Sequence, residues 1–520
     1  MSRGVRRLLA AAAVLAVTMT AGCSATGTDD DSGPSPSPSR SQTGAAREYL
    51  TQHVDWSTCF DKFQCATVKV PLDWDDPDGS EIGIAVIRTQ QADNTRGTIL
   101  VDPGGPGGSG FNIVKDSLGY VTTDRLQSHY AIAGFDPRGV GRSSAVDCFT
   151  DAGRDRMRSN DADPDTDAGF KNLRSMYHRF ANACQKHTGA LLEHVDTESA
   201  ARDMDVIRAA LGERKLNYLG FSYGTKLGAT YARLYPGKVG RFVLDGALDP
   251  SLTSVQIALG QAKGFERELR VYIRRCGQQP DCPLDGGVDH GARQVRALLD
   301  SATRTPLTAT DGRKVGGSLL ASGIIAALYN TANWQYLTQG LAGAMNGDPS
   351  VLLALADQSA DRDQSGNYTS NGNEAFIAIN CLDYSPPAKK AAMRAVAARI
   401  EKASPTFGPE LAYTGLTCAN WPVPSTAHAP KPPGTDKPGT DKPGTDKPGT
   451  APILVVGTTG DPATPYAWAK SLTRKLPGAR LLTWKGEGHT AYGRAGPCIN
   501  KKVDAYFVTG TMPPRGTTCR

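Results

Sequence analysis

Three side chains of the kinds used in nucleophilic catalysis follow one another along this sequence, each in a glycine-rich setting. The first is Ser222, in the motif Gly220–Gly224, which is the single G-x-S-x-G of the chain. The apolar run Leu216–Leu219 predicts a strand before the motif, and Thr225–Leu234 predicts a helix after it. A serine on a sharp turn between strand and helix is a nucleophile elbow, and the glycines are needed because the turn is too tight for side chains. We therefore predict that Ser222 is a nucleophile.

A serine nucleophile needs a general base, and the base needs a carboxylate that orients it. Asp461 and His489 each follow a short apolar run near the C-terminus, and His489 is the only histidine after Asp461. Glu487 is a second acid nearby, but it lies only two residues from His489 and would struggle to turn back onto the ring. The chain order serine, acid, histidine is that of the α/β-hydrolase fold. The predicted triad is Ser222, Asp461 and His489, and the predicted chemistry is acyl transfer.

An oxyanion that forms during acyl transfer requires backbone N–H donors. One is expected from Tyr223, directly after the nucleophile. The other is expected from the glycine-rich turn 102–110, which follows an early strand. Pro106 in that turn has no N–H, so Gly105 is the candidate donor.

The same turn supports a distant alternative. Gly105, Gly107 and Gly110 match G-x-G-x-x-G after a strand, and Asp136 closes the next strand, as in a dinucleotide-binding fingerprint. Pro106 inside the turn argues against this alternative, and it leaves the triad residues unexplained. A non-catalytic binding protein on a hydrolase scaffold is disfavoured because no triad position is missing.

The elements that must position these residues alternate between strand and helix on both sides of a helical insertion. Short apolar runs predict strands at Thr98–Val101, Ala131–Phe135, Leu216–Leu219, Phe242–Leu244, Pro452–Gly457 and Arg480–Trp484. Such alternation predicts an α/β fold with a mostly parallel central sheet. The expected organisation is an export signal (1–23), a disordered tether (24–47), the first part of an α/β-hydrolase core (48–249), a helical lid (250–425), a Pro/Gly-rich repeat loop (426–451) and the rest of the core (452–520).

The N-terminus predicts export. Three arginines precede the apolar run Leu8–Val17, which is too short to cross a bilayer as a mature helix. Small residues before Cys23 resemble a bacterial lipobox, although Thr20 stands where leucine is usual; ordinary cleavage nearby is the alternative. We expect an extracellular protein, either secreted or held at the outer face of the membrane through a lipid on Cys23. The formal charge is only +6, with acids and bases interspersed, so no nucleic-acid partner is indicated.

Cysteine usage also indicates an oxidising compartment. Besides Cys23, the chain has ten cysteines, an even number, with no CxxC or HExxH pattern that would indicate a metal site. Sequence alone does not choose among the pairings, and the hypothesis is that neighbours pair because short loops close at low entropic cost. The expected pairs are Cys59–Cys65, Cys148–Cys184, Cys276–Cys282, Cys381–Cys418 and Cys498–Cys519.

Taken together, these motifs resemble the secreted tripeptidyl aminopeptidases of actinomycetes, which are related to the proline iminopeptidases. The resemblance extends from Cys59 to Cys519 and rests on Val101–Gly107, Asp136–Gly141, Gly220–Gly224, Ala378–Asp383, Gly460–Pro462 and Gly488–Cys498. It implies peptide substrates, hydrolysis from a free N-terminus with release of tripeptides or other short peptides, and no cofactor. The alternative within the fold is an esterase or lipase acting on small acyl substrates, because the same triad serves both.

The resemblance also implies acidic lid residues that bind the substrate's ammonium group, since a buried ammonium requires a carboxylate partner. In the lid segment 373–383, which best matches the family, Glu374 and Asp383 are the only acids. Both are therefore candidates for binding the substrate N-terminus. The alternative is that either residue caps a helix or faces solvent.

Overall fold

A ten-stranded sheet runs through the molecule in the computed structural model, which describes residues 47–90, 95–426 and 451–520. The strand order is β1-β2-β3-β5-β4-β6-β7-β10-β11-β12; the N-terminal strands pair antiparallel and all pairs from β5 to β12 are parallel. The strands are β1 Ser57–Cys59, β2 Phe63–Pro71, β3 Glu81–Thr89, β4 Thr98–Asp102, β5 Ala131–Phe135, β6 Leu216–Phe221, β7 Val239–Asp245, β10 Leu454–Gly460, β11 Arg480–Glu487 and β12 Thr518–Cys519. The predicted α/β class with a mostly parallel sheet is confirmed.

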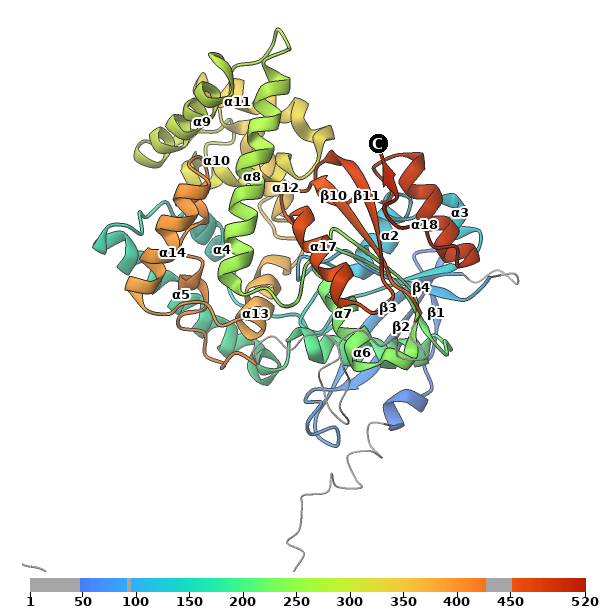
Figure 1. The fold of residues 1–520 in the computed structure, drawn as a ribbon. Helices are drawn as coiled ribbons and strands as arrows, with labels where there is room; N and C mark the ends of the chain where they lie inside the picture. The colour runs from blue at the N-terminus through green and yellow to red at the C-terminus, as the bar shows by residue number, and fades with distance from the viewer. Residues whose placement is uncertain (1–46, 91–94, 427–450) are drawn as a thin grey trace, which may run out of the picture.

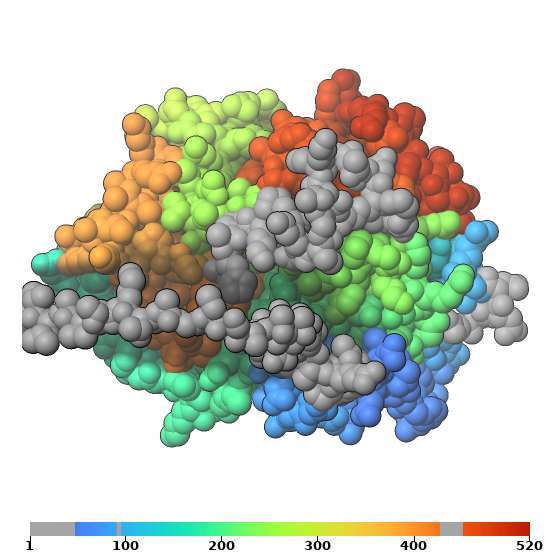
Figure 2. Space-filling view, turned by 60° about the horizontal axis from the view of Figure 1, so that its bottom comes forward, coloured from blue at the N-terminus to red at the C-terminus, as the bar shows by residue number. Residues whose placement is uncertain are grey.

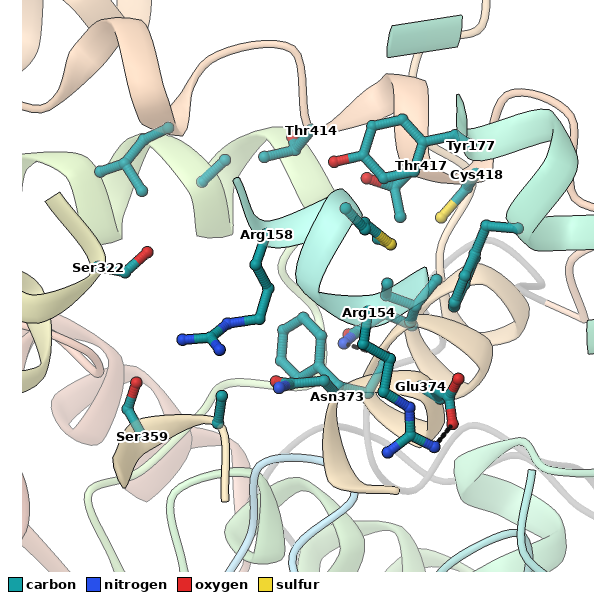
Figure 3. A pocket seen from close by; sticks show the side chains of 18 of the residues that line it. Arg154, Arg158, Tyr177, Ser322, Ser359, Asn373, Glu374, Thr414, Thr417 and Cys418 are labelled. Carbon is teal, nitrogen blue, oxygen red and sulfur yellow. Dashed lines mark hydrogen bonds and ion pairs between the residues drawn. The ribbon is translucent and has the colours of Figure 1, made fainter. Parts of the chain in front are cut away.

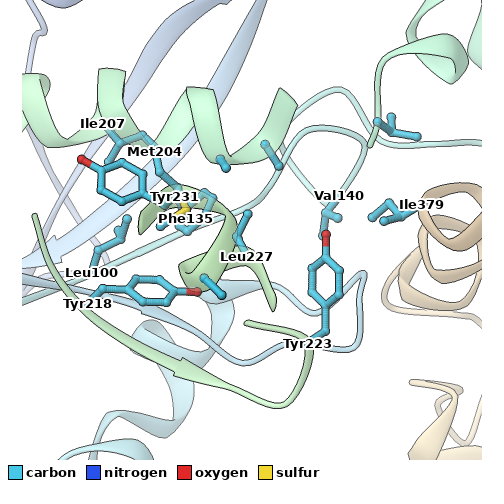
Figure 4. Packing of buried hydrophobic residues seen from close by; sticks show 14 of the residues in the cluster. Leu100, Phe135, Val140, Met204, Ile207, Tyr218, Tyr223, Leu227, Tyr231 and Ile379 are labelled. Atoms are coloured by element: carbon cyan, nitrogen blue, oxygen red, sulfur yellow. The ribbon is translucent and has the colours of Figure 1, made fainter. Parts of the chain in front are cut away.

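Helices cover both faces of the sheet (Figure 1). On one face α6 (Thr197–Ala210), α7 (Tyr223–Leu234) and α17 (Tyr466–Lys475) pack on the strands, and Figure 4 shows Met204 and Leu227 of this layer. On the other face lie α2 (Gly110–Val121), α3 (Asp124–Gln127) and α18 (Pro497–Thr509). Every residue of β4 and β5 is buried, as expected for strands covered on both sides.

Between β7 and β10 the chain forms a helical insertion, Ser254–Cys418, which we call the lid. Its helices are α8 Ser254–Cys276, α9 Gly287–Arg304, α10 Gly317–Leu328, α11 Trp334–Met345, α12 Ser350–Ser359, α13 Gly372–Asp383, α14 Lys390–Ala403, α15 Gly408–Leu411 and α16 Gly415–Cys418, with a small hairpin of β8 Leu307–Thr308 and β9 Lys314–Val315. Helices α8 to α12 enclose an apolar core of their own, whereas α13 packs into the core of the sheet domain. Figure 4 shows Tyr223 of the elbow pointing toward Val140, with Ile379 of α13 beside it.

Helices α4 (Asp151–Arg158) and α5 (Asp167–Thr188) contact both the sheet domain and the lid. Phe180 of α5 belongs to the core of the sheet domain. Phe170, near the start of the same helix, packs with Met393 and Tyr413 of the lid. Figure 2 shows this teal segment beside the orange part of the lid.

Five disulfides join the same neighbouring cysteines that the sequence analysis paired: Cys59–Cys65, Cys148–Cys184, Cys276–Cys282, Cys381–Cys418 and Cys498–Cys519. Within the described ranges, no helix is long and apolar enough to cross a membrane. The export signal with Cys23, residues 24–46 of the tether, and the repeat at 427–450 lie outside the described residues.

Candidate active site

Ser222 occupies a strained turn between β6 and α7. Its backbone has φ 54° and ψ −121°, a region that a residue with a side chain rarely adopts. The turn is held by its amide, which donates to the carbonyl of Asp245 at 2.9 Å. A Cβ on Gly220 would lie 2.5 Å from the carbonyl oxygen of Gly224, and a Cβ on Gly224 would lie 2.6 Å from the carboxylate of Asp102. Close approach of backbone therefore requires both glycines of the motif.

Asp461 and His489 are hydrogen-bonded to each other at the ends of the neighbouring strands β10 and β11. His489 Nδ1 lies 2.9 Å from both carboxylate oxygens of Asp461, so it donates to the acid and leaves Nε2 as the acceptor. Nε2 is buried and has no partner among the described residues. The amides of Ala463 and Thr464 and the hydroxyl of Thr464 also donate to Asp461, at 3.0, 2.7 and 2.9 Å. These bonds fix the carboxylate and hence the imidazole.

Ser222 and His489 approach the same stretch of backbone, at the end of β7. The Ser222 amide donates to the carbonyl of Asp245, as described above. Gly246 follows Asp245, and a Cβ on Gly246 would lie 3.1 Å from His489 Cε1. Asp245 itself accepts from the amides of Ala491 and Tyr492, at 2.9 and 2.7 Å, and so holds the loop that follows the histidine. Burial raises the pKa of Asp245 to about 6. The three predicted triad residues are thus brought to one edge of the sheet, at the carboxyl ends of its parallel strands.

The glycine-rich turn after β4 lies against the elbow. A Cβ on Gly104 would meet the carbonyl of Phe221 at 2.4 Å and the amide nitrogen of Tyr223 at 2.9 Å. Asp102 anchors the turn by accepting from the Gly104 amide at 2.8 Å, and burial raises the pKa of Asp102 to about 7. Among the described residues, the amides of Gly105 and Tyr223 have no hydrogen-bond acceptor. Both candidate oxyanion donors are therefore available to a substrate oxygen.

The same geometry does not fit the dinucleotide alternative. Asp136 is fully buried and accepts from the hydroxyl of Ser109 and from the amide of Arg142, so its carboxylate cannot reach a ribose. Gly107 lies against the lid, where a Cβ would be 2.3 Å from the carbonyl of Gly372. No room is left there for a pyrophosphate, and the alternative is wrong for this turn.

A cavity of about 530 Å³ opens between the lid and helices α4 and α5 (Figure 3). It borders the catalytic region on two sides. Phe376 lines the cavity, and a Cβ on Gly107 of the glycine-rich turn would lie 3.1 Å from its amide nitrogen. Gln261 also lines the cavity and donates to the carbonyl of Ala463, beside Asp461, at 3.1 Å. The cavity is thus placed to hold the part of a substrate that extends from the scissile bond.

Ion pairs hold the polar part of the cavity wall. Glu374 lines it, accepts from the amide of Phe149 at 2.8 Å and pairs with Arg154 at 2.5 Å, as the dashed line in Figure 3 marks. Burial raises the pKa of Glu374, and the charge of Arg154 acts in the opposite direction and lowers it. Arg158 is bonded to Asp357 at 3.0 Å, and in Figure 3 it extends toward the side where Ser322 and Ser359 lie.

Asp383, the second acid proposed for the substrate N-terminus, does not line the cavity. It is buried under α7, where Lys226 Nζ lies 2.7 Å from its carboxylate and Thr197 donates to it from both its amide and its hydroxyl. Its charge is satisfied inside the protein. The structure therefore separates the two acids that the sequence grouped together.

Several residues that shape the site carry no sequence signal of their own. Asp245 precedes a glycine, as many turn residues do, and its role depends on backbone amides more than two hundred residues away. The role of Asp102 depends on its burial. The signal available for Asp102 was its place between an apolar strand and the glycine-rich turn. Arg154 lies on a highly charged helix that resembles a solvent-facing one.

The chain is similar in sequence to several known proteins. A family model described as TAP-like protein matches residues 404–519. The serine protease Hip1 of Mycobacterium tuberculosis is 35% identical over 502 residues, covering 91% of this chain and 92% of the relative. The carboxylesterase B of the same species is 35% identical over 467 residues, covering 88% and 86%. The tripeptidyl aminopeptidase of Streptomyces lividans is 32% identical over 489 residues, covering 90% and 86%.

Proposed function

The chain belongs to the TAP-like family of α/β hydrolases, and from this premise we propose that it is an exported serine aminopeptidase. It hydrolyses peptide bonds near a free N-terminus and releases tripeptides or other short peptides. The observation that carries the proposal is the His489–Asp461 couple at the same sheet edge as the strained Ser222 elbow. The expected substrates are peptides, and the proposed reaction uses the triad and two backbone donors.

The proposed mechanism follows from the atoms available. Ser222 Oγ attacks the scissile carbonyl carbon while His489 Nε2 takes the hydroxyl proton. Asp461 keeps Nδ1 protonated and stabilises the imidazolium that forms. The amides of Gly105 and Tyr223 donate to the oxyanion. His489 then protonates the leaving amine, and a water molecule, deprotonated by the same Nε2, releases the acyl group from Ser222.

The proposal is that the cavity binds the free N-terminus of the substrate. Among the described residues that line the cavity, Glu374 is the one acid, and an incoming ammonium would share its carboxylate with Arg154. Asp383 is not part of this proposal because it lies outside the lining and is paired with Lys226.

Export is supported by the five disulfides, which persist in oxidising compartments. Lipidation of Cys23 stays a prediction from the sequence. It is tested by mass spectrometry of the N-terminal peptide from cells that express the full chain.

The central experiment profiles the purified enzyme on free and N-acetylated peptides of graded length, together with small acyl esters. The proposal expects cleavage of free peptides a fixed number of residues from the N-terminus and at least about tenfold slower cleavage after acetylation, because a charge-assisted bond to the ammonium is lost. Efficient hydrolysis of esters with no cleavage of any peptide would favour the esterase alternative. In either case a serine-reactive phosphonate should label Ser222.

A further inference from the structure

The first lid helix, α8, lies along the loop that carries the catalytic acid. Two glycines one helical turn apart allow this contact: a Cβ on Gly260 would lie 2.5 Å from the ring of Trp468, and a Cβ on Gly264 would lie 2.1 Å from the carbonyl oxygen of Pro462. The next residue at this spacing, and thus on the same face of the helix, is Glu268. The face of α8 that packs closely through Gly260 and Gly264 therefore continues with a titratable side chain, that of Glu268.

Glu268 is completely buried against the start of both catalytic loops. Its Oε2 lies 3.1 Å from Arg267 Nη2, and the same nitrogen lies 3.3 Å from Oε2 of Glu487. Oε1 of Glu268 has no partner among the described residues. Glu487 pairs with Gly460 across β10 and β11, and a Cβ on Gly460 would lie 1.7 Å from its carboxylate. The two acids therefore meet where the chain leaves the sheet toward Asp461 and His489.

Two ionised carboxylates cannot be kept close together in a buried place by one guanidinium that is itself 42% exposed. The charged groups that face Glu268 are Glu487 from β11, Arg267 from its own helix and Asp461 from the loop after β10. Burial, followed by the nearby Glu487, raises the pKa of Glu268 to about 9. Near neutral pH the pair holds a proton.

We propose that Glu268 and Glu487 are positioning residues that share one proton, and that this acid–carboxylate pair fixes the lid helix to the sheet edge where the loops of Asp461 and His489 begin. The role presumes the triad of the proposed function. The occupant is a proton and not a substrate ammonium, because Glu268 has no exposed surface and neither acid lines the cavity. Removal of the proton leaves two like charges beside Asp461 and weakens the contact between lid and loop.

The first test is the pH dependence of kcat, measured on a peptide and on a small ester between pH 6 and 11. The parent should lose activity above about pH 9 as the shared proton leaves. Glu268→Gln supplies a hydrogen-bond donor that does not titrate. The alkaline limb of its kcat–pH profile should therefore move up by about one pH unit or more. Glu268→Ala, which removes the contact, should lower kcat by about tenfold at neutral pH with little change in KM. Glu266→Gln is the matched control, since Glu266 is buried on the same helix but bonded to Ser404 and Thr406, and it should keep the parent's limb.

The second test needs no substrate. Between the unfolded-state value near 4.5 and the folded value, the folded protein binds one more proton than the unfolded protein, so this pair makes stability fall as pH rises. Glu268→Gln removes the titrating group, and its Tm relative to the parent should increase steadily from pH 5 to pH 9. Superimposable Tm curves, or an alkaline limb that stays in place in Glu268→Gln, would overturn the inference. A protein inactive on all peptides and esters would refute the proposed function. The Tm measurement would still decide whether Glu268 and Glu487 share a proton.

Discussion

The edge of the sheet that carries the predicted triad and the wall of the lid cavity are held by different interactions. At the sheet edge, Asp461 accepts from backbone amides and one hydroxyl besides His489, and Asp245 accepts from two amides. In the cavity wall, ion pairs such as Arg154–Glu374 join helices from different parts of the chain. Local backbone geometry therefore fixes the chemistry, whereas long-range charge pairing shapes the place where substrate would lie.

This difference has a physical basis. A catalytic carboxylate must hold its partner within a few tenths of an ångström, and amides on rigid strand ends provide fixed donors for it. A substrate cavity tolerates longer and more flexible side chains. Changes at the sheet edge should therefore affect kcat, and changes in the cavity wall should affect KM.

The largest expected effect is that of Ser222→Ala. Turnover should fall by a factor on the order of 10⁴ or more, with residual catalysis from the oxyanion donors, because only the nucleophile's hydroxyl is lost. Stability should stay within about 1 kcal/mol of the parent, since the Ser222 hydroxyl makes no capping hydrogen bond to α7. Turnover of a peptide substrate and urea unfolding measure the two quantities. Near-normal turnover, or phosphonate labelling at another serine, would contradict the triad.

The next effect concerns a buried ion pair in the core, which should affect stability and leave the chemistry intact. Arg138 is fully buried and donates twice to Asp203, at 2.7 Å each, besides binding three carbonyl groups. Arg138→Leu leaves Asp203 as an uncompensated buried charge, so the free energy of unfolding should fall by about 3–5 kcal/mol. Lys69→Ala, which breaks an exposed pair with Glu81, is the control and should cost less than about 1 kcal/mol. Equal losses in both variants, measured by urea unfolding, would contradict the assignment.

A smaller effect is expected from the cavity wall. Glu374→Gln keeps the shape of the side chain but removes its charge, so KM for free peptides should rise by an amount equivalent to about 1–3 kcal/mol of binding. Hydrolysis of a small ester without an ammonium group should hardly change. Asp383→Asn is the matched control: it weakens the bond to Lys226 outside the cavity and should lower Tm with KM unchanged. Equal losses on peptide and ester in Glu374→Gln would remove this residue from substrate binding.

The sequence was sufficient for the sheet edge because each predicted residue there belongs to a short motif that folds locally. Glycines around Ser222 and the turn at Asp102 carry the geometry in a few adjacent residues. The parallel strands could be predicted because they are apolar throughout, as burial on both faces requires.

The cavity could not be predicted, because its parts meet only after folding. Arg154 and Glu374 are 220 residues apart, and nothing in a charged helix indicates a distant partner. The same reason explains why the contact of Phe170 with the lid could not be predicted and why the sequence grouped Glu374 with Asp383. Glu268 also escaped notice, because burial of an acid depends on the small residues of its helix and on a strand end more than two hundred residues later.

The smallest expected effect tests how strongly the lid depends on its connection to the core. Helix α8 begins with a capping box, in which the Thr253 hydroxyl accepts from the amide of Gln256 and the Gln256 side chain accepts from the amide of Thr253. Thr253→Ala removes one half of the box and should lower the free energy of unfolding by about 1 kcal/mol. Thr253→Ser keeps the hydroxyl and is the control.

The position of this cap at the start of α8 determines the expected effects of Thr253→Ala on hydrogen exchange and on kcat. The first two turns of α8 lead to Gly260 and Gly264, which contact Trp468 and the Asp461 loop. Fraying of these turns should speed amide hydrogen exchange at 254–260 more than in β7, while kcat changes by less than about threefold because the loop keeps its own hydrogen bonds. If Thr253→Ala instead lowered kcat as strongly as a change at the sheet edge, the first turns of α8 would also position the catalytic residues. The contrast between a sheet edge fixed by local backbone geometry and a cavity wall held by ion pairs would then not hold.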